Sequence, residues 1–335
     1  MRQVNLWGIG AAVAVGAVVT GCSSMIGPRP AGVPTWKEAH MEEKHLSDLG
    51  VWAVTDDAKI VQLKEDCKDD AANWKAVCER IWQPTDCPRA RPFIRESELG
   101  ALKGPNHIST VCHKAAWQLS KVMITCDGGA FVQYDPHLRK IEVFGIVEGR
   151  PCGITQLKNT VFVLACPDKD RLTFVDTIAH PFRSENQPRS HFAFKGASGC
   201  AWDQVRGVLW AIGDEGLVAL RYNLLTDRSV EPLYGYDWSA YGTRARDFQL
   251  WNDGRIRFTT EKGVVVFDPD AETFALLPGT AGVTSFAPSS KGDLRFTEAD
   301  GAVIRGDAKK VPTSTLKIKA ATLMPTWFRD FDTAG

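Results

Sequence analysis

The feature that most constrains the fold is a unit that recurs along the chain. Each copy contains two runs rich in β-branched and aromatic residues, joined by a turn with acidic residues or glycine. The copies cover residues 51–63, 122–135, 161–176, 208–222, 255–268 and 293–305. From the second copy onward the spacing is roughly 40 to 48 residues, the length of a four-stranded propeller blade. The pattern predicts an all-β fold, a six-bladed β-propeller.

The fifth copy shows the expected blade most fully. Residues 246–250 are expected to form strand A, 255–260 strand B, 264–268 strand C and 274–277 strand D. The Asn-Asp-Gly sequence at 252–254 supplies the positive φ that a hairpin turn requires. Residues 115–320 contain no amphipathic helical pattern of useful length, which argues against Rossmann and TIM-barrel folds.

One segment departs from the repeat. The first two copies are separated by about 70 residues instead of one blade length. The extra segment, 65–114, is rich in cysteine, and its apolar spacing predicts a short helix around 70–82. The body is therefore expected to span 36–335 with this insertion inside it. A strand in 314–320 is a candidate for completing a blade, although the sequence does not show how the ring closes.

The N-terminus has the features of an export signal. A short basic start is followed by an apolar run from Leu6 to Val19, too short for a typical membrane-spanning helix. Small residues then precede Cys22, which resembles a bacterial lipoprotein cleavage site with Cys22 lipidated. We expect a signal peptide at 1–21 and a flexible Ser/Gly/Pro-rich tether at 22–35. Ser23 favours outer-membrane sorting in a Gram-negative bacterium; the alternative is an ordinary secretory signal.

The composition restricts the partners. Of the 335 residues, 44% are hydrophobic and 24% charged, which excludes a disordered chain. Forty basic residues balance forty acidic ones, so no strong field points to nucleic acid. The membrane is expected as a partner only through the lipid, and no cofactor is expected.

Eight cysteines remain in the body of an exported chain, a number that suggests disulfides. The repeat favours Cys126–Cys152 and Cys166–Cys200, each joining neighbouring blades. Cys112 would then pair with one of three cysteines of the insertion: Cys67, Cys78 and Cys87. The alternative is free or differently paired thiols. No Cys-x-x-Cys pair occurs, and the nearest metal-like cluster, His107, Cys112 and His113, is not favoured.

The turns between strands B and C are acidic in every copy. They could form a ring of carboxylates for a structural cation or a basic ligand. The interpretation that we favour is simpler, because Asp and Gly are the ordinary residues of tight turns.

Two groups of residues are candidates for ligand binding. The strand A segments are polar, and they contribute Trp202, Asp203, Arg244, Arg246 and Asp247. An arginine in a channel could bind a carboxylate or a sugar acid, or could form a salt bridge between blades. An aromatic segment contributes Tyr234, Tyr236, Trp238 and Tyr241. These rings could stack on sugars, or could fold back into a satellite core. A basic loop at 180–197 could contact an anionic ligand.

The chain resembles a family of uncharacterised secreted bacterial lipoproteins with a propeller-like domain of unknown function. The resemblance covers most of residues 45–330 and is carried by the segments 198–203, 208–213, 246–248 and 327–328. It implies a propeller and export, and no known reaction. The family pattern has His at the positions of Ser198 and Arg246, which weakens any role for channel histidines.

We therefore expect a lipid-anchored binding module for a glycan or an envelope protein, acting at a loop-rich face of the propeller. Two alternatives stay open. One is a carbohydrate-active hydrolase or lyase that uses channel carboxylates with Arg246. The other is a structural member of an envelope complex. The fold does not choose among them.

Overall fold

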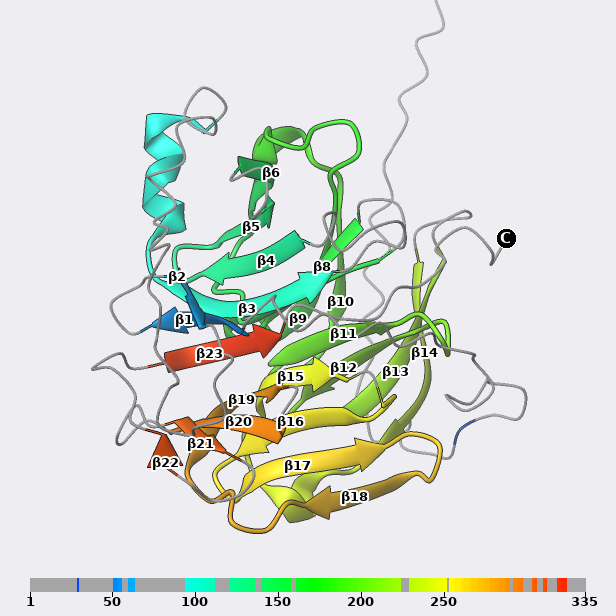
Figure 1. The fold of residues 1–335 in the computed structure, drawn as a ribbon. Helices are drawn as coiled ribbons and strands as arrows, with labels where there is room; N and C mark the ends of the chain where they lie inside the picture. Colours follow the sequence, from blue (N-terminus) through cyan, green and yellow to red (C-terminus); the bar gives the residue numbers. More distant parts are fainter. Residues whose placement is uncertain are drawn as a thin grey trace, which may run out of the picture.

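The computed structural model is all-β in the residues that it describes (Figure 1). These are residues 29, 51–55, 60–63, 94–111, 121–135, 140–157, 161–223, 229–251, 253–289, 292–297, 303–305, 310–311 and 318–323. The signal peptide, Cys22, the helix expected at 70–82 and the cysteines at 67, 78, 87 and 112 lie outside them. Within this described part of the chain, none of the helices has the length and hydropathy to cross a bilayer.

The described strands form six antiparallel sheets. The first sheet contains β1 (Val51–Thr55), β2 (Ile60–Leu63) and β23 (Ile318–Leu323) in the order β2-β1-β23. The second contains β3 (Pro105–Val111), β4 (Lys121–Cys126), β5 (Ala130–Asp135) and β6 (Lys140–Ile146); the third contains β7 (Gly153–Gln156), β8 (Val161–Cys166), β9 (Arg171–Asp176) and β10 (Arg189–Ala193).

The remaining three sheets repeat the same meander. The fourth contains β11 (Gly199–Asp203), β12 (Val208–Gly213), β13 (Gly216–Asn223) and β14 (Ser229–Tyr236); the fifth contains β15 (Arg246–Leu250), β16 (Ile256–Thr260), β17 (Gly263–Asp268) and β18 (Thr273–Leu276). The sixth contains β19 (Val283–Ser289), β20 (Gly292–Thr297), β21 (Val303–Arg305) and β22 (Lys310–Val311). Helical segments in the described ranges are short 3-10 turns: η5 (Glu96–Leu102), η8 (Pro167–Lys169), η9 (Ser184–Asn186) and η10 (Ser239–Tyr241).

The sheets are arranged around a centre as a propeller. One strand of each sheet contacts its counterparts in both neighbouring sheets, in the cyclic order β3, β7, β11, β15, β19 and β23. The ring closes because the C-terminal strand β23 pairs with β1 and also contacts β3. A C-terminal strand does complete a blade, but it lies at 318–323 instead of the expected 314–320. It belongs to the same sheet as the N-terminal repeat unit.

The burial of the middle strands follows from this arrangement. Every side chain of β4, β8 and β12 is buried. Each of these strands has a neighbouring sheet on both faces, so both sets of alternating side chains enter an apolar layer. The sequence consequently shows continuous apolar runs in these strands instead of the alternation of a half-exposed strand.

Polar side chains on the innermost strands connect adjacent sheets. The Ser109 hydroxyl donates to the carbonyl of Ile154 at 2.9 Å, which joins β3 to β7. The Trp202 backbone N–H donates to the Thr155 hydroxyl at 3.1 Å, which joins β11 to β7. These contacts explain the polar strand A segments structurally, because each satisfies a polar group inside the ring.

Two sequence-based boundaries were wrong. The innermost strand of the second sheet is β3, at 105–111, so the expected insertion at 65–114 contains part of a blade. Pro105 and a register shift between Pro105 and His107 hide this strand from a period-2 pattern. The expected basic loop at 180–197 contains the outer strand β10. Its first part covers the edge of β6, where the Phe144 N–H donates to the Pro181 carbonyl.

Candidate functional site

The alternation of strand directions sorts the connections into two rims. Because neighbouring strands are antiparallel, the turns between strands B and C and the loops between strands D and A lie on one side, which we call the mouth rim. The turns between A and B and between C and D lie on the other side, which we call the opposite rim.

Three exposed arginines lie on the mouth rim: Arg150, Arg244 and Arg246. Arg150 precedes β7, while Arg244 and Arg246 lie at the start of β15, two sheets further along the ring. The charges of Arg150, Arg244 and Asp168 all act on the Cys152 thiol. The Arg150 guanidinium also pairs with Asp127 at 2.6 Å. Exposed arginines from two sheets thus lie on the same rim, with acidic side chains beside Arg150.

The Cys152 thiol is not an activated nucleophile. Its apolar surroundings raise its pKa to about 12, and the two arginines only partly oppose this effect. The Sγ atom donates to the Ser198 carbonyl at 3.3 Å. A thiol that stays protonated at neutral pH is a weak nucleophile, so the mouth rim has binding groups without a thiolate.

Carboxylates of the mouth-rim turns hold loop backbone. Asp168 accepts the Arg150 N–H at 2.9 Å and Glu261 accepts the Thr243 N–H at 2.8 Å. Asp170 accepts the Gly196 N–H at 2.9 Å. Among the described residues, no three His, Cys, Asp or Glu side chains are grouped as metal ligands. Hydrogen bonds to loop backbone therefore account for Asp168, Asp170 and Glu261 of the acidic turns.

Asp247 lies next to Arg246 in sequence but below the surface. Its carboxylate accepts the Phe286 N–H at 2.8 Å and the Ser285 hydroxyl at 2.9 Å from β19. Gln249 donates a third hydrogen bond at 3.0 Å. Burial raises the pKa of Asp247 to about 7 despite these donors. Its φ of 46° is rare for a residue other than glycine and coincides with a register shift in β15.

The aromatic segment is folded into the core. Trp238 is 3% exposed and its indole N–H donates to the Gly213 carbonyl at 3.1 Å. Tyr234 is equally buried, and the Tyr241 hydroxyl donates to the Phe274 carbonyl at 3.1 Å. Tyr236, which is half-buried, packs against Phe267. The hypothesis of an exposed sugar platform was wrong, because these rings fill the layer between the fourth and fifth sheets.

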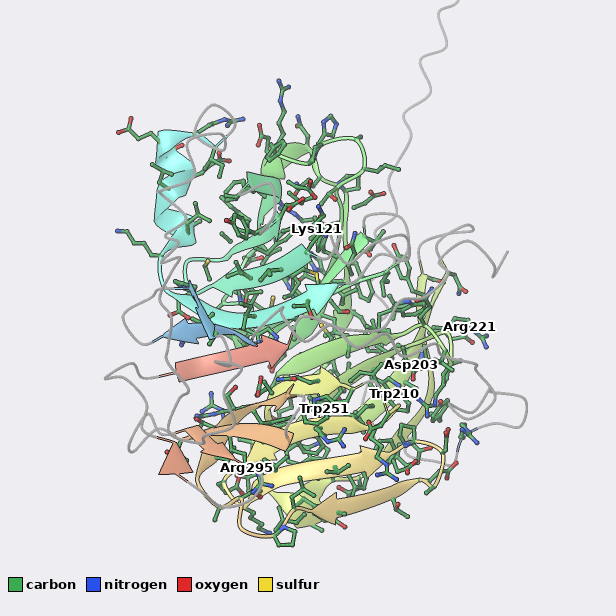
Figure 2. The ribbon with its side chains drawn as sticks, in the orientation of Figure 1. Lys121, Asp203, Trp210, Arg221, Trp251 and Arg295 are labelled. Carbon is green, nitrogen blue, oxygen red and sulfur yellow. The ribbon has the colours of Figure 1, made fainter. Side chains whose placement is uncertain are left out.

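Asp203 was also wrongly grouped with the arginines. It is fully buried at the opposite rim, where it pairs with Arg206 at 2.7 Å and accepts the Trp210 indole N–H at 3.2 Å. Figure 2 shows Asp203 and Trp210 close together on the fourth sheet. Trp202, on the same strand, is half-buried against the layer between the third and fourth sheets. Neither residue reaches the mouth rim with Arg244 and Arg246.

The two predicted disulfides are absent, since Cys126, Cys152, Cys166 and Cys200 are all free. Cys126 belongs to the apolar cluster that also contains Val54 of the first sheet. Cys152 precedes β7 of the third sheet, and its Sγ lies against the Ser198 carbonyl, next to the fourth sheet. Shared positions at strand ends brought these cysteines to one rim, but the direction of each side chain decides which neighbouring sheet it meets. The pairings with Cys112 lie outside the described residues.

Sequence reasoning missed Arg150. Only its neighbour Cys152 attracted attention, yet Arg150 precedes strand A of its sheet much as Arg244 precedes strand A of the fifth. Aligning the loops before each strand A would have found it. His107, from the unfavoured metal cluster, is buried with its pKa lowered to about 4 by desolvation, while Cys112 and His113 are outside the described ranges.

Comparisons with known proteins concern the fold. The chain is similar in structure to virginiamycin B lyase from Staphylococcus aureus, with 13% identity, coverage of 83% of this chain and 89% of that chain, and a TM-score of 0.44. A catalytically inactive variant of that enzyme with quinupristin gives 11% identity, coverage of 82% and 87%, and a TM-score of 0.46. No protein-family model matches the sequence. No curated protein matches it either.

Proposed function

We propose that this chain is a lipid-anchored, six-bladed propeller of the bacterial envelope that binds an anionic glycan at its mouth rim. The observation that carries the proposal is that the exposed Arg150 and Arg244 both lie on mouth-rim loops of different sheets. The exposed Arg246 extends this group at the start of β15. The count of six blades rests on the six sheets and on the closed ring of innermost strands.

An anionic ligand follows from the chemistry of the guanidinium group. Its planar set of N–H donors matches a carboxylate in a bidentate contact and keeps its charge at every accessible pH. Acidic sugars present such carboxylates along a chain. Arginines on separate loops can therefore bind successive acidic groups of one glycan, which suits a wide rim better than a single deep pocket.

Binding is favoured over catalysis because the mouth-rim carboxylates near these arginines, although exposed or half-buried, hold loop backbone or pair with arginine. Asp247 is 8% exposed, and its oxygens accept hydrogen bonds from three donors. The acidic turn residues Asp168 and Glu261 are occupied by loop N–H groups. A hydrolase or lyase needs a carboxylate or base within reach of the scissile bond.

The test compares glycan binding by wild type and an Arg244→Ala/Arg246→Ala variant. We expect acidic glycans to bind wild type more tightly than neutral ones, with affinity that falls as salt rises. The double variant is expected to lose at least ten-fold in affinity with an unchanged melting temperature. Arg221→Ala, which removes an exposed arginine on β13, is the matched control. Equal binding by the double variant would reject the proposal, and a stable envelope-protein partner without glycan binding would favour the protein-partner alternative.

The membrane address has its own test. Lipidation at Cys22 predicts that the protein partitions with membranes, because each buried methylene contributes about 0.8 kcal/mol. A Cys22→Ala variant is expected to be released into the soluble fraction. Retention of that variant in the membrane would show that the anchor lies elsewhere.

A further inference from the structure

Arg29, from the segment expected to be a free tether, is bound to the body of the propeller. Its Nη1 atom lies 3.0 Å from Asp270 Oδ1, and its backbone N–H donates to Glu272 Oε1 at 3.2 Å. Both side chains of the Arg29–Asp270 pair are largely covered, at 16% and 19% exposed. A covered pair with a second backbone contact fixes position more firmly than an exposed ion pair does.

The acceptor for Arg29 is itself held in place. Asp270 Oδ1 also accepts Arg206 Nη2 at 2.8 Å, and Arg206 is 1% exposed in its side chain. Arg206 pairs in turn with the buried Asp203 and donates to the Gly254 carbonyl at 3.2 Å. The Asp270 carboxylate is thus oriented by a buried network that joins the fourth and fifth sheets. The carboxylate is therefore preorganised to accept a second guanidinium, that of Arg29.

The electrostatic effect of Arg29 extends to two tyrosines of β14. The charge of Arg29 acts on the hydroxyls of both Tyr234 and Tyr236. Both hydroxyls are buried and have no hydrogen-bond partner among the described residues. The hydrogen bonds of Arg29 within the described part of the chain are therefore those to the two carboxylates, Asp270 and Glu272.

We infer that Asp270 and Glu272 form a docking site for Arg29, and that this contact turns the opposite rim of the propeller toward the bilayer. The second part rests on the proposed lipidation of Cys22. Arg29 lies seven positions after Cys22 in the sequence. Such a chain spans at most about 25 Å. The turn that contains Asp270 is therefore held close to the membrane surface, and the mouth rim with Arg244 and Arg246 faces away from it, open to ligand.

The docking itself is tested in the mature chain by hydrogen exchange followed by mass spectrometry. Arg29→Ala is expected to speed exchange at least ten-fold in the peptide containing residue 29. Glu272→Gln should give a smaller increase there, because it weakens only the backbone contact and leaves the Arg206 network intact. Arg221→Ala is the control on a distant exposed arginine. Unchanged exchange in Arg29→Ala would overturn the docking.

The orientation is tested by energy transfer to acceptor-labelled lipid headgroups in phosphatidylethanolamine–phosphatidylglycerol vesicles. A donor dye is attached to an unnatural amino acid that replaces either Lys262 or Ala271. These positions flank β17, with Lys262 at the mouth rim and Ala271 at the opposite rim. Both positions are exposed. They are separated by about 20 Å of strand. We expect at least two-fold greater transfer from position 271, and a smaller difference in Arg29→Ala.

The outcomes separate the two proposals. Equal transfer from both positions in vesicle-bound wild type would overturn the orientation while leaving the anchor in place. Failure of the protein to float with vesicles would overturn the anchor and the orientation together. The hydrogen-exchange result decides the docking of Arg29 in either case, because that measurement does not require a membrane.

Discussion

Asp247 and Phe286 join two innermost strands of different sheets, because the Asp247 carboxylate accepts the Phe286 N–H at 2.8 Å. The Ser285 hydroxyl donates to the same oxygen at 2.9 Å. The carboxylate is buried and its pKa is raised to about 7. The carboxylate that connects these two innermost strands therefore titrates near neutral pH.

The first prediction follows from that pKa. Between the ordinary value of 3.8 and about 7, the native state holds a proton on Asp247 that the unfolded state has released. This group therefore lowers the free energy of unfolding as pH rises through that window. Asp247→Asn, which stays neutral, should lose this slope. Urea denaturation of both proteins at pH 5 and pH 8 measures it, and an identical pH dependence in the variant would contradict the assignment.

The second prediction concerns the buried ion pair of Asp203 and Arg206. Arg206→Ala leaves the Asp203 carboxylate buried without its partner, and should cost about 3–5 kcal/mol. The control pair is Arg221 and Glu231, which lie 3.5 Å apart with more than half of each side chain exposed. Arg221→Ala should cost less than about 1 kcal/mol. Equal losses in denaturant titrations would show that burial of the pair has no special effect.

A third prediction separates packing from ligand binding at Trp238. Trp238→Ala should lower the free energy of unfolding by about 3–5 kcal/mol, because it removes a ring that contacts Phe258 within the core. Trp238→Phe should cost less, since it keeps an aromatic ring and loses mainly the hydrogen bond to Gly213. Loss of glycan binding by Trp238→Ala at an unchanged melting temperature would instead place this ring at the ligand.

The fourth prediction uses the close approach of β11 and β15. A Cβ atom added at Gly199 would lie 2.3 Å from Phe248 Cβ, so the two innermost strands would have to separate. Gly199→Ala should therefore cost at least about 1–3 kcal/mol. Gly100→Ala is the control, because a Cβ there meets nothing within 4 Å. It should change stability by less than about 1 kcal/mol. Thermal denaturation of the two variants compares them.

The fifth prediction concerns thiol reactivity. Burial raises the pKa of Cys126 to about 12 and that of Cys166 to about 11, so both should react slowly with iodoacetamide in the native protein. Denaturation should raise the rate at least a hundred-fold. Peptide mapping of the alkylated protein reports each cysteine separately. A Cys126–Cys152 linked peptide from the native protein would contradict the free thiols.

Much of the fold was determined by local sequence. Turn residues such as those at 252–254 and apolar runs such as 161–166 mark hairpins through short-range chemistry, and the strands β8, β12 and β16 lie within a residue or so of their predicted positions. Closure of the ring was not predictable in this way. It depends on β23 pairing with β1 across nearly the whole chain, a long-range contact without a local signature.

For the candidate site too, local sequence predicted some features and long-range packing decided the others. The sequence by itself determined which residues carry charge or aromatic rings, and the strand pattern placed Arg244 and Arg246 at the start of an innermost strand. Only the tertiary structure decided their surroundings. It buried Trp238 and Asp203, left Cys126 and Cys152 as free thiols, and bound Arg29 to Asp270. Strand periodicity specifies alternation along a strand, whereas the neighbour that each side chain meets depends on how separate sheets pack.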